Sequence, residues 1–301
     1  MAIMICAIVV SASAQAAAGE EQEQNKADYG HVVLENTWTY PLHSEVTGRD
    51  YLLYVGYPDS YASNPERKYP VVYMTDGYWD FIKMNSLGTN LWTDKAAPEY
   101  IVVGIGYADK SLRPEIERAY ELSPTTVDYG IPSQFKMRMG GSDKFLQAIK
   151  TEIIPFVETQ TRADPSYRVM AGSSLGGLFS LFCMYEEPGL FQGIIAASPT
   201  VSWDHFWLFN RASELRMKAV GDDMSGRFSV PCRLFMSVGN EEPPFYVGEI
   251  KAFDQIISCS GYDDFSYKFR IIDGFGHRGS VAEAYGRGLR YVLEPLNVAA
   301  R

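Results

Sequence analysis

A serine lies at the centre of a Gly-x-Ser-x-Gly sequence, Gly172-Ser173-Ser174-Leu175-Gly176, between an apolar strand-like run and an apolar helix-like run. This context is the one that a nucleophile elbow requires. At such a turn the serine backbone is strained, and the flanking Gly172 and Gly176 let strand and helix approach closely. The amide of Leu175 and the helix dipole would favour a developing oxyanion there. The sequence therefore predicts Ser174 as a nucleophile; a purely structural glycine-rich turn is the alternative.

A serine hydroxyl needs a base with a pKa near neutrality to remove its proton, so a histidine must come within hydrogen-bond reach. We expect that base to be His277. It lies in the glycine-rich segment DGFGHRGS, directly after the last expected strand, and folds with a nucleophile elbow deliver their histidine from a late loop. His31 and His43 precede the expected sheet, and His205 lies among aromatic residues that favour packing or substrate contact.

An acidic residue that orients the histidine should lie between serine and histidine in chain order, at the end of the preceding strand. The segment RLFMSVGNEEP places Glu241 and Glu242 there. Adjacent side chains diverge, so only one can face the imidazole. We prefer Glu242, which lies three residues past the turn glycine Gly239. Glu241 is the alternative acid, and a solvated surface carboxylate is the alternative role for both.

A second donor to the oxyanion should come from the loop after an early strand. The segment VVYMTDGYWDF has this form, because an apolar run ends in Asp76-Gly77 and is followed by Tyr78. We therefore expect the backbone amide of Tyr78 to be this donor. From the dipeptide alone, an Asp-Gly turn without catalytic contact is an equal alternative.

Short β-rich runs alternate with helical stretches from Tyr51 onward: YLLYV, VVYM, IVVGI, RVMA, GIIAA, RLFMSV and FSYKFRII. The clearest helix spans about residues 142–159, with apolar side chains on one face. Several middle runs are almost wholly apolar, as expected when helices cover both faces, whereas YLLYVGY and FSYKFRI alternate more and should lie nearer an edge. The sequence thus predicts an α/β fold with one doubly wound, mostly parallel sheet.

No break in composition divides the 301 residues, of which 46% are hydrophobic and 21% charged. We therefore expect one domain over residues 31–298. The connection at residues 107–141 contains several prolines and is long for a compact domain, so we expect a loop insertion that shapes the substrate pocket. A surface excursion without substrate contact is the alternative.

The N-terminal segment has the pattern of a signal peptide. Residues 1–18 combine an apolar run with small residues that offer Ala-x-Ala cleavage sites, although no Lys or Arg precedes the run. Residues 19–30 are polar and charged and should form a flexible lead into the domain. We expect a secreted or periplasmic protein without membrane insertion, because no apolar stretch approaches the ~20 residues that cross a bilayer.

Charge and metal-ligand spacing limit the possible partners. The net charge of −10 argues against nucleic acid, because phosphate binding needs clustered Lys and Arg. The four histidines are scattered and no Cys/His cluster has ligand spacing, so we expect no metal and no other cofactor. The expected partner is a small-molecule ester, and the sequence does not determine the oligomeric state.

Together, the motifs resemble the esterase D-like family of α/β-hydrolases, particularly its branch of bacterial enterochelin (siderophore) esterases and carbohydrate acyl esterases. The similar segments follow the family's order over most of the expected domain: YPVVYMTDGYWDF, IERAYELSP, GGSDKFLQAIKTEIIPFVE, AGSSLGGLFSLF, IIAASPTVSWDH, SVGNEE and GHRGSVAEAYGRGLRYVL. The resemblance implies the α/β-hydrolase fold and cofactor-free ester hydrolysis through an acyl-enzyme on Ser174, with the oxyanion at the amides of Leu175 and Tyr78. Some members use a serine–histidine dyad, so the need for an acid stays open.

The candidate substrate contacts are aromatic and basic. Trp79 and Trp203 could stack on a catecholate, feruloyl or sugar ring, and Arg118 and Arg278 could bind an anionic siderophore. The substrate class depends on where the basic side chains lie in the fold. If they converge on the pocket, a siderophore is favoured, and if they scatter, a neutral feruloyl or acetyl carbohydrate ester is favoured. The basic residues are Arg113, Arg118, Lys136, Arg138 and Arg278. Acyl transfer to an alcohol and a non-catalytic binding role are further alternatives.

Overall fold

The computed structural model describes residues 33–109, 111–127, 138–223 and 228–299. The expected signal peptide and the expected flexible lead therefore lie outside the described residues. The larger of two compact units spans residues 36–127 and 137–301 and contains every element described below. The smaller unit falls almost entirely on residues that are not described.

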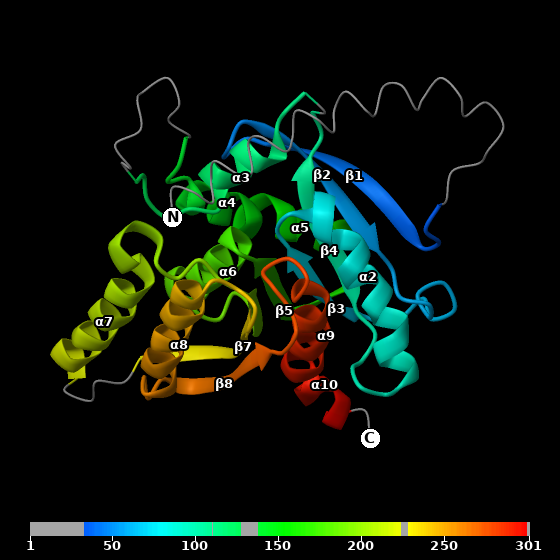
Figure 1. The fold of residues 1–301 in the computed structure, drawn as a ribbon. Helices are drawn as coiled ribbons and strands as arrows, with labels where there is room; N and C mark the ends of the chain where they lie inside the picture. Colours follow the sequence, from blue (N-terminus) through cyan, green and yellow to red (C-terminus); the bar gives the residue numbers. More distant parts are fainter. Residues whose placement is uncertain (1–32, 110, 128–137, 224–227, 300–301) are drawn as a thin grey trace. The chain divides into compact units, whose positions relative to one another are not determined.

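An eight-stranded sheet forms the centre of the larger unit (Figure 1). Its strand order is β1-β2-β4-β3-β5-β6-β7-β8. The strands β1 and β2 run antiparallel to their neighbours, whereas β3 to β8 are mutually parallel. The strands are β1 (Thr37–Ser44), β2 (Arg49–Gly56), β3 (Tyr69–Met74), β4 (Ile101–Tyr107), β5 (Ala163–Ser173), β6 (Gly193–Ala197), β7 (Ser229–Gly239) and β8 (Asp263–Ile272).

The register brings the carboxyl ends of the parallel strands to one edge of the sheet. Ser173 at the end of β5 pairs with Ala197, which in turn pairs with Ser237 near the end of β7. Gly239 then pairs with Ile272, the last residue of β8. The loops that follow these strands must therefore lie close together, which is the usual place for a ligand site in an open α/β sheet.

Helices cover both faces of the sheet (Figure 1). One core contains Met84 of α2 and Tyr285 of α9, and the other contains Phe179 of α6 and Phe253 of α8. All residues of β3 and β6 are buried, which explains why these runs are almost wholly apolar. The helices are α2 (Gly77–Thr93), α3 (Pro114–Glu121), α4 (Ser142–Ala148), α5 (Ile154–Gln160), α6 (Leu175–Glu186), α7 (Trp203–Asp223), α8 (Pro244–Ser258), α9 (Val281–Val292) and α10 (Glu294–Ala299).

The expected doubly wound, mostly parallel α/β sheet is confirmed, and the expected runs fall in β2 to β8. The sequence predicts no strand before Tyr51, yet β1 forms the outer edge beside β2. It is half-exposed and contains Pro41, which an edge strand tolerates. The helix expected near residues 142–159 is present as α4, a π-helical turn at Ile149–Ile153 and α5.

The long connection after β4 contains a helix that the sequence pattern does not predict. Strand β4 ends at Tyr107, α3 follows at Pro114, and α4 begins at Ser142. Pro114 at the first position of α3 is compatible with a helix start, because the amide that proline lacks has no partner within the helix there. Within the expected insertion, residue 110 and residues 128–137, which include Lys136, lie outside the described residues.

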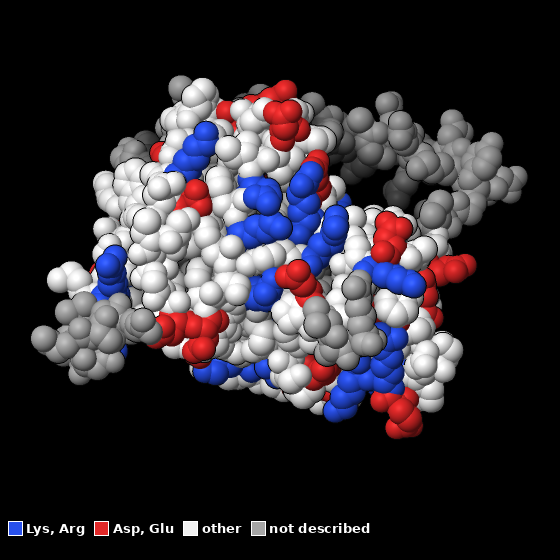
Figure 2. Space-filling view, turned by 90° about the horizontal axis from the view of Figure 1, so that it is seen from below, with Lys and Arg blue, Asp and Glu red and all other residues white. Residues whose placement is uncertain are grey.

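The surface charge is mixed despite the negative net charge. Figure 2 shows Lys and Arg side chains gathered near the middle of the face seen from below, with Asp and Glu side chains beside and around them.

Among the helices that the structure describes, none combines the length and apolar character needed to cross a bilayer.

Candidate active site

The turn from β5 to α6 has the geometry of a nucleophile elbow. Ser174 has φ 60° and ψ −117°, a strained backbone conformation for a residue other than glycine. A Cβ on Gly172 would lie 2.3 Å from the carbonyl oxygen of Gly176, and one on Gly176 would lie 2.3 Å from Oγ1 of Thr75. Both positions therefore require glycine, as the motif predicts, and the strain at Ser174 is held by tight packing around the turn.

His277 and Glu242 come together from the loops after β8 and β7. Nδ1 of His277 lies 2.6 Å from Oε2 of Glu242, whose side chain is fully buried. The other oxygen, Oε1, accepts from the Ser198 hydroxyl at 2.5 Å and from the Gly239 amide at 2.9 Å. Glu241, the alternative acid, is exposed. The structure thus places Glu242 against the imidazole.

The surroundings of Glu242 keep its carboxylate charged. Burial by itself would raise its pKa, but the hydrogen bonds from His277, Ser198 and the Gly239 amide outweigh burial and lower the pKa below its ordinary value. A carboxylate can only accept hydrogen bonds, so Nδ1 of His277 carries a proton and Nε2 is the nitrogen left to act as a base.

Ser174 and His277 share a neighbour, Tyr246, the third residue of α8. The Tyr246 ring lies edge-on to the imidazole, with ring centroids 5.4 Å apart. Its phenol oxygen is 3.4 Å from Oγ1 of Thr200, whose amide donates to the Ser174 carbonyl at 3.2 Å. No direct hydrogen bond joins the Ser174 hydroxyl to His277, both of which are described residues. Such bonds are often long in an enzyme without substrate and tighten when it binds.

The two amides expected to be oxyanion donors lie at helix N-termini. Leu175 is the first residue of α6 and Tyr78 the second of α2, so neither amide has an acceptor within its helix. Asp76, just before α2, adopts the left-handed conformation with φ 56°. A Cβ on Gly77 would lie 2.5 Å from the backbone of Gly104, so this Asp-Gly turn is packed tightly against β4. The oxyanion role of the two amides stays a prediction.

The comparison with protein families decides the assignment. A family model described as a putative esterase matches residues 44–230, which is most of the sheet and includes the elbow. The chain belongs to this esterase family. The predicted family resemblance and the predicted class, a carboxylic ester hydrolase, are thereby confirmed.

Several curated relatives of this esterase are siderophore esterases by name. The siderophore triacetylfusarinine C esterase of Aspergillus fumigatus is 26% identical over 230 residues, 73% of each chain. The ferri-bacillibactin esterase BesA of Bacillus subtilis is 22% identical over 294 residues, 92% of this chain and 97% of that one. The apo-salmochelin esterase of Escherichia coli is 28% identical over 193 residues, 63% of this chain and 58% of that one.

Solved structures support the fold of the esterase. The BES protein from Bacillus cereus superposes with a TM-score of 0.75 at 22% identity, over 89% of this chain and 98% of that one. The siderophore hydrolase EstB from Aspergillus nidulans gives a TM-score of 0.71 at 22% identity, again over 89% and 98%. At this identity the likeness establishes the fold alone.

A small hollow lies beside the elbow. Asp76 lines it, and Oδ2 of Asp76 is 3.1 Å from the position that a Cβ on Gly176 would take. Residues of α3, within the expected insertion, line part of its wall, and the role of the insertion in substrate binding stays a prediction. The lining residues are Thr75, Asp76, Tyr78, Trp79, Ile105, Gly106, Tyr107, Pro114, Arg118, Glu121, Leu122 and Phe145.

The predicted substrate contacts differ in their access to this pocket. Arg118 lines it, but its guanidinium donates to both carboxylate oxygens of Asp76, at 2.6 and 2.8 Å, and so carries a neutralised charge. Trp79 is 39% exposed and lies beside Arg118. Trp203 is only 4% exposed and donates to Thr125, so the structure corrects this prediction: the ring packs in the core. Arg278 is exposed next to His277.

Sequence reasoning missed two residues of the site, Ser198 and Tyr246. Ser198 follows β6 and donates to Glu242, and its segment was among those that resemble the family. Tyr246 lies beyond the acid on α8, where its spacing carries no motif. The sequence therefore carries a signal for Ser198 and none for Tyr246.

Within the described chain, no three His, Cys, Asp or Glu residues form a group that could hold a metal ion.

Proposed function

We propose that the protein hydrolyses a siderophore ester through an acyl-enzyme on Ser174. The observation that carries this proposal is the buried, charged Glu242, which lies 2.6 Å from Nδ1 of His277 beside the strained serine turn. This is the arrangement of nucleophile, base and orienting acid that ester hydrolysis needs. The siderophore esterases among the relatives support the choice of substrate class.

In the first half of the reaction, Oγ of Ser174 attacks the ester carbonyl carbon while Nε2 of His277 takes the hydroxyl proton. Glu242 stabilises the imidazolium that forms. The amides of Leu175 and Tyr78 donate to the oxyanion of the tetrahedral intermediate. Collapse of this intermediate breaks the ester C–O bond, and His277 protonates the alkoxide that leaves.

In the second half, His277 removes a proton from water, and the resulting hydroxide attacks the acyl carbon on Ser174. The tetrahedral intermediate again collapses, releasing the acid product, and His277 returns the proton to Oγ. No cofactor takes part in either half.

A neutral feruloyl or acetyl carbohydrate ester is the second candidate substrate class. It is favoured by the pairing of Arg118 with Asp76, because this pairing neutralises the arginine that lines the pocket. Arg113 and Arg138 are exposed, and the Arg138 guanidinium lies 3.7 Å from the ring centre of Tyr120. Arg278, also a predicted contact, is an exposed cation next to His277 in the chain.

The deciding experiment measures p-nitrophenyl acetate hydrolysis by wild type, Ser174→Ala and His277→Ala, with circular dichroism to check folding. We expect each substitution to reduce kcat by about ten-thousandfold or more. Ferric and apo siderophores, feruloyl sugars and acetyl sugars then form the substrate panel. Siderophores should give the highest kcat/KM. A higher value for a feruloyl or acetyl sugar would favour the second class, and variants as active as wild type would refute this site.

We also propose that residues 1–18 are a signal peptide and that the mature protein is periplasmic or secreted. The support is the apolar run followed by Ala-x-Ala sites. Expression of the full chain in a bacterial host with fractionation, followed by mass spectrometry of the N-terminus, tests this. A chain that keeps residues 1–18 and remains with the cytoplasmic fraction would overturn the proposal.

A further inference from the structure

Tyr246 is a buried phenol that contacts His277 and lies beside Ser174. It is 7% exposed, and its hydroxyl donates to the backbone carbonyl of Ser198 at 2.7 Å. A phenol carries one proton, so once this proton is donated the oxygen can only accept from other hydroxyls. The available donors are Thr200, whose Oγ1 is 3.4 Å away and whose amide donates to the Ser174 carbonyl at 3.2 Å, and the neighbouring Ser174 hydroxyl.

Burial keeps this phenol neutral. It raises the pKa of Tyr246 well above its ordinary value, and the nearby charge of Glu242 acts in the same direction, against the weaker lowering by the Thr200 and Ser174 hydroxyls. Tyr246 therefore keeps its proton near neutral pH, and it serves as a fixed dipole next to the nucleophile.

Ser198 connects Tyr246 to the acid. Its hydroxyl donates to Glu242 while its carbonyl accepts from Tyr246, and its φ of 43° is in the left-handed region that few residues other than glycine adopt. Such strain persists only when the surroundings hold it. The two hydrogen bonds of Ser198 are therefore part of what fixes the distance between the acid and α8.

The ring of Tyr246 constrains the imidazole from the side. The interplanar angle with His277 is 81° and the centroid distance is 5.4 Å, an edge-to-face contact. Together with the Glu242 bond at Nδ1, this contact leaves the imidazole little freedom to rotate out of line with Ser174.

We propose that Tyr246 is a positioning residue of the hydrolytic site: its ring fixes the plane of His277, and its phenol oxygen holds the Ser174 hydroxyl next to that imidazole. This inference rests on the proposed esterase function. In the resting enzyme the Ser174 proton points to the phenol oxygen. When the ester binds, the hydroxyl rotates and donates to Nε2 of His277 instead.

The test compares Tyr246→Phe, which keeps the ring, with Tyr246→Leu, which removes both ring and phenol. Tyr100→Phe is the matched control, because Tyr100 is also a buried phenol that donates to a backbone carbonyl, that of Met84, and lies before β4 away from Ser174. The kcat and KM of p-nitrophenyl acetate hydrolysis are measured per active site, counted by titration with a fluorophosphonate, so that misfolded protein does not enter the rates.

We expect kcat to fall about tenfold in Tyr246→Phe and about a hundredfold in Tyr246→Leu, with KM within about twofold of wild type and Tyr100→Phe unchanged. The second-order rate of Ser174 phosphonylation should fall in the same order, since that reaction needs the nucleophile and base but no ester pocket. Wild-type kcat and phosphonylation rates in both Tyr246 variants would overturn the proposal. So would a change confined to KM.

The same proteins separate this inference from the proposed function. If the wild type hydrolyses no ester, the proposed function fails, whereas the phosphonylation rates of the four proteins still decide the role of Tyr246. If ester hydrolysis is intact and independent of Tyr246, the positioning role alone fails.

Discussion

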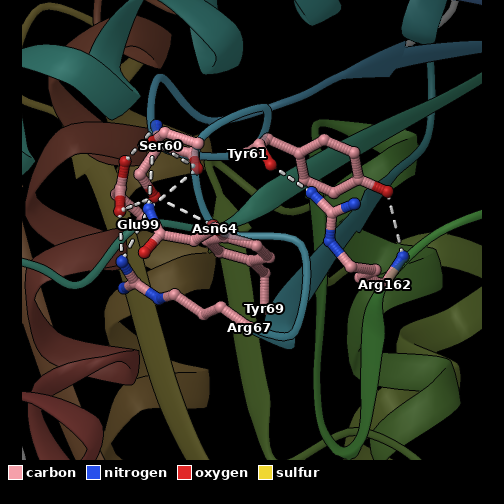
Figure 3. Close-up of polar contacts among 8 residues, drawn as sticks. Ser60, Tyr61, Asn64, Arg67, Tyr69, Glu99 and Arg162 are labelled. Atoms are coloured by element: carbon pink, nitrogen blue, oxygen red, sulfur yellow. Dashed lines mark hydrogen bonds and ion pairs between the residues drawn. The ribbon is translucent and has the colours of Figure 1, made fainter.

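Two buried carboxylates at opposite edges of the sheet have the same kinds of hydrogen-bond partner. At the carboxyl edge, Glu242 accepts from the Gly239 amide, the Ser198 hydroxyl and His277. At the amino edge, just before β4, Glu99 accepts from the Ser60 amide at 2.9 Å, from the Ser60 hydroxyl at 2.6 Å and from the Arg67 guanidinium at 2.6 Å (Figure 3). Each thus binds one amide, one hydroxyl and one nitrogen-bearing side chain.

The third partner separates a structural site from a chemical one. The Arg67 guanidinium has only hydrogen-bond donors and is also held over the rings of Tyr69 and Trp92, so the Glu99 cluster can only stabilise the chain. The imidazole of His277, by contrast, has a second nitrogen, Nε2, that can accept a proton, and it packs against Tyr246 beside Ser174. Burial and hydrogen bonding of a carboxylate therefore do not identify an active site; a titratable partner beside a nucleophile does.

The largest expected effect, on catalysis, follows from replacing Glu242. Glu242→Gln should reduce kcat by about a thousandfold or more, because the amide neither fixes the Nδ1 proton of His277 nor stabilises the imidazolium. Glu99→Gln, the equivalent change at the other edge, should leave kcat within about twofold. Steady-state hydrolysis of p-nitrophenyl acetate measures both. A kcat for Glu242→Gln close to wild type would mean that Ser174 and His277 work as a dyad.

The second effect is on stability and is expected when the other carboxylate, Glu99, is replaced. Glu99→Gln should lower the free energy of unfolding by about 2 kcal/mol, because it leaves the partly buried Arg67 without its counter-charge. Urea unfolding followed by tryptophan fluorescence measures it. Arg67→Lys, which keeps the charge but loses ring stacking, is the companion variant and should cost less. An unchanged unfolding midpoint in Glu99→Gln would remove the structural role assigned to this cluster.

A smaller effect concerns the pH dependence of stability. The folded-state pKa of Glu242 lies below its ordinary value of 4.5. Its stabilising contribution is therefore fully present above the unfolded-state pKa and is lost as pH falls through the lower, folded-state pKa. The urea midpoint of wild type should fall more steeply between pH of about 5 and about 3 than that of Glu242→Gln. Parallel curves for the two proteins would contradict the lowered pKa.

The local motifs of the site were predictable because they depend on a few neighbouring residues. The elbow needs glycine at positions 172 and 176, where any Cβ would collide with backbone or with Thr75. The pair at 241 and 242 follows a strand whose end is set by its apolar run. Side-chain partners across elements were not predictable in this way. Tyr246 reaches Ser198 only because α8 packs beside the end of β6, and no spacing in the sequence encodes that distance.

The aromatic and basic residues show the same limit. Trp203 and Trp79 both follow strands that end near the site, yet one ring is buried in the core and the other is 39% exposed. Arg118 lies in the predicted insertion, but its pairing with Asp76 depends on how α3 packs against the turn after β3. Residue type and order therefore predicted where the site would form, whereas access to the substrate is determined by tertiary packing.

The smallest expected effect comes from the residue next to the acid. The sequence predicts Glu241 as the alternative acid to Glu242. Its side chain is exposed, and its backbone amide donates to the Phe275 carbonyl at 3.1 Å. Because Glu241→Gln keeps that backbone bond, it should change neither kcat nor, beyond about 0.5 kcal/mol, the free energy of unfolding. Measured beside Glu242→Gln, this variant distinguishes the roles of two adjacent carboxylates of equal charge. If Glu241→Gln instead lost activity as Glu242→Gln does, the negative potential near His277 would matter more than the hydrogen bond at Nδ1.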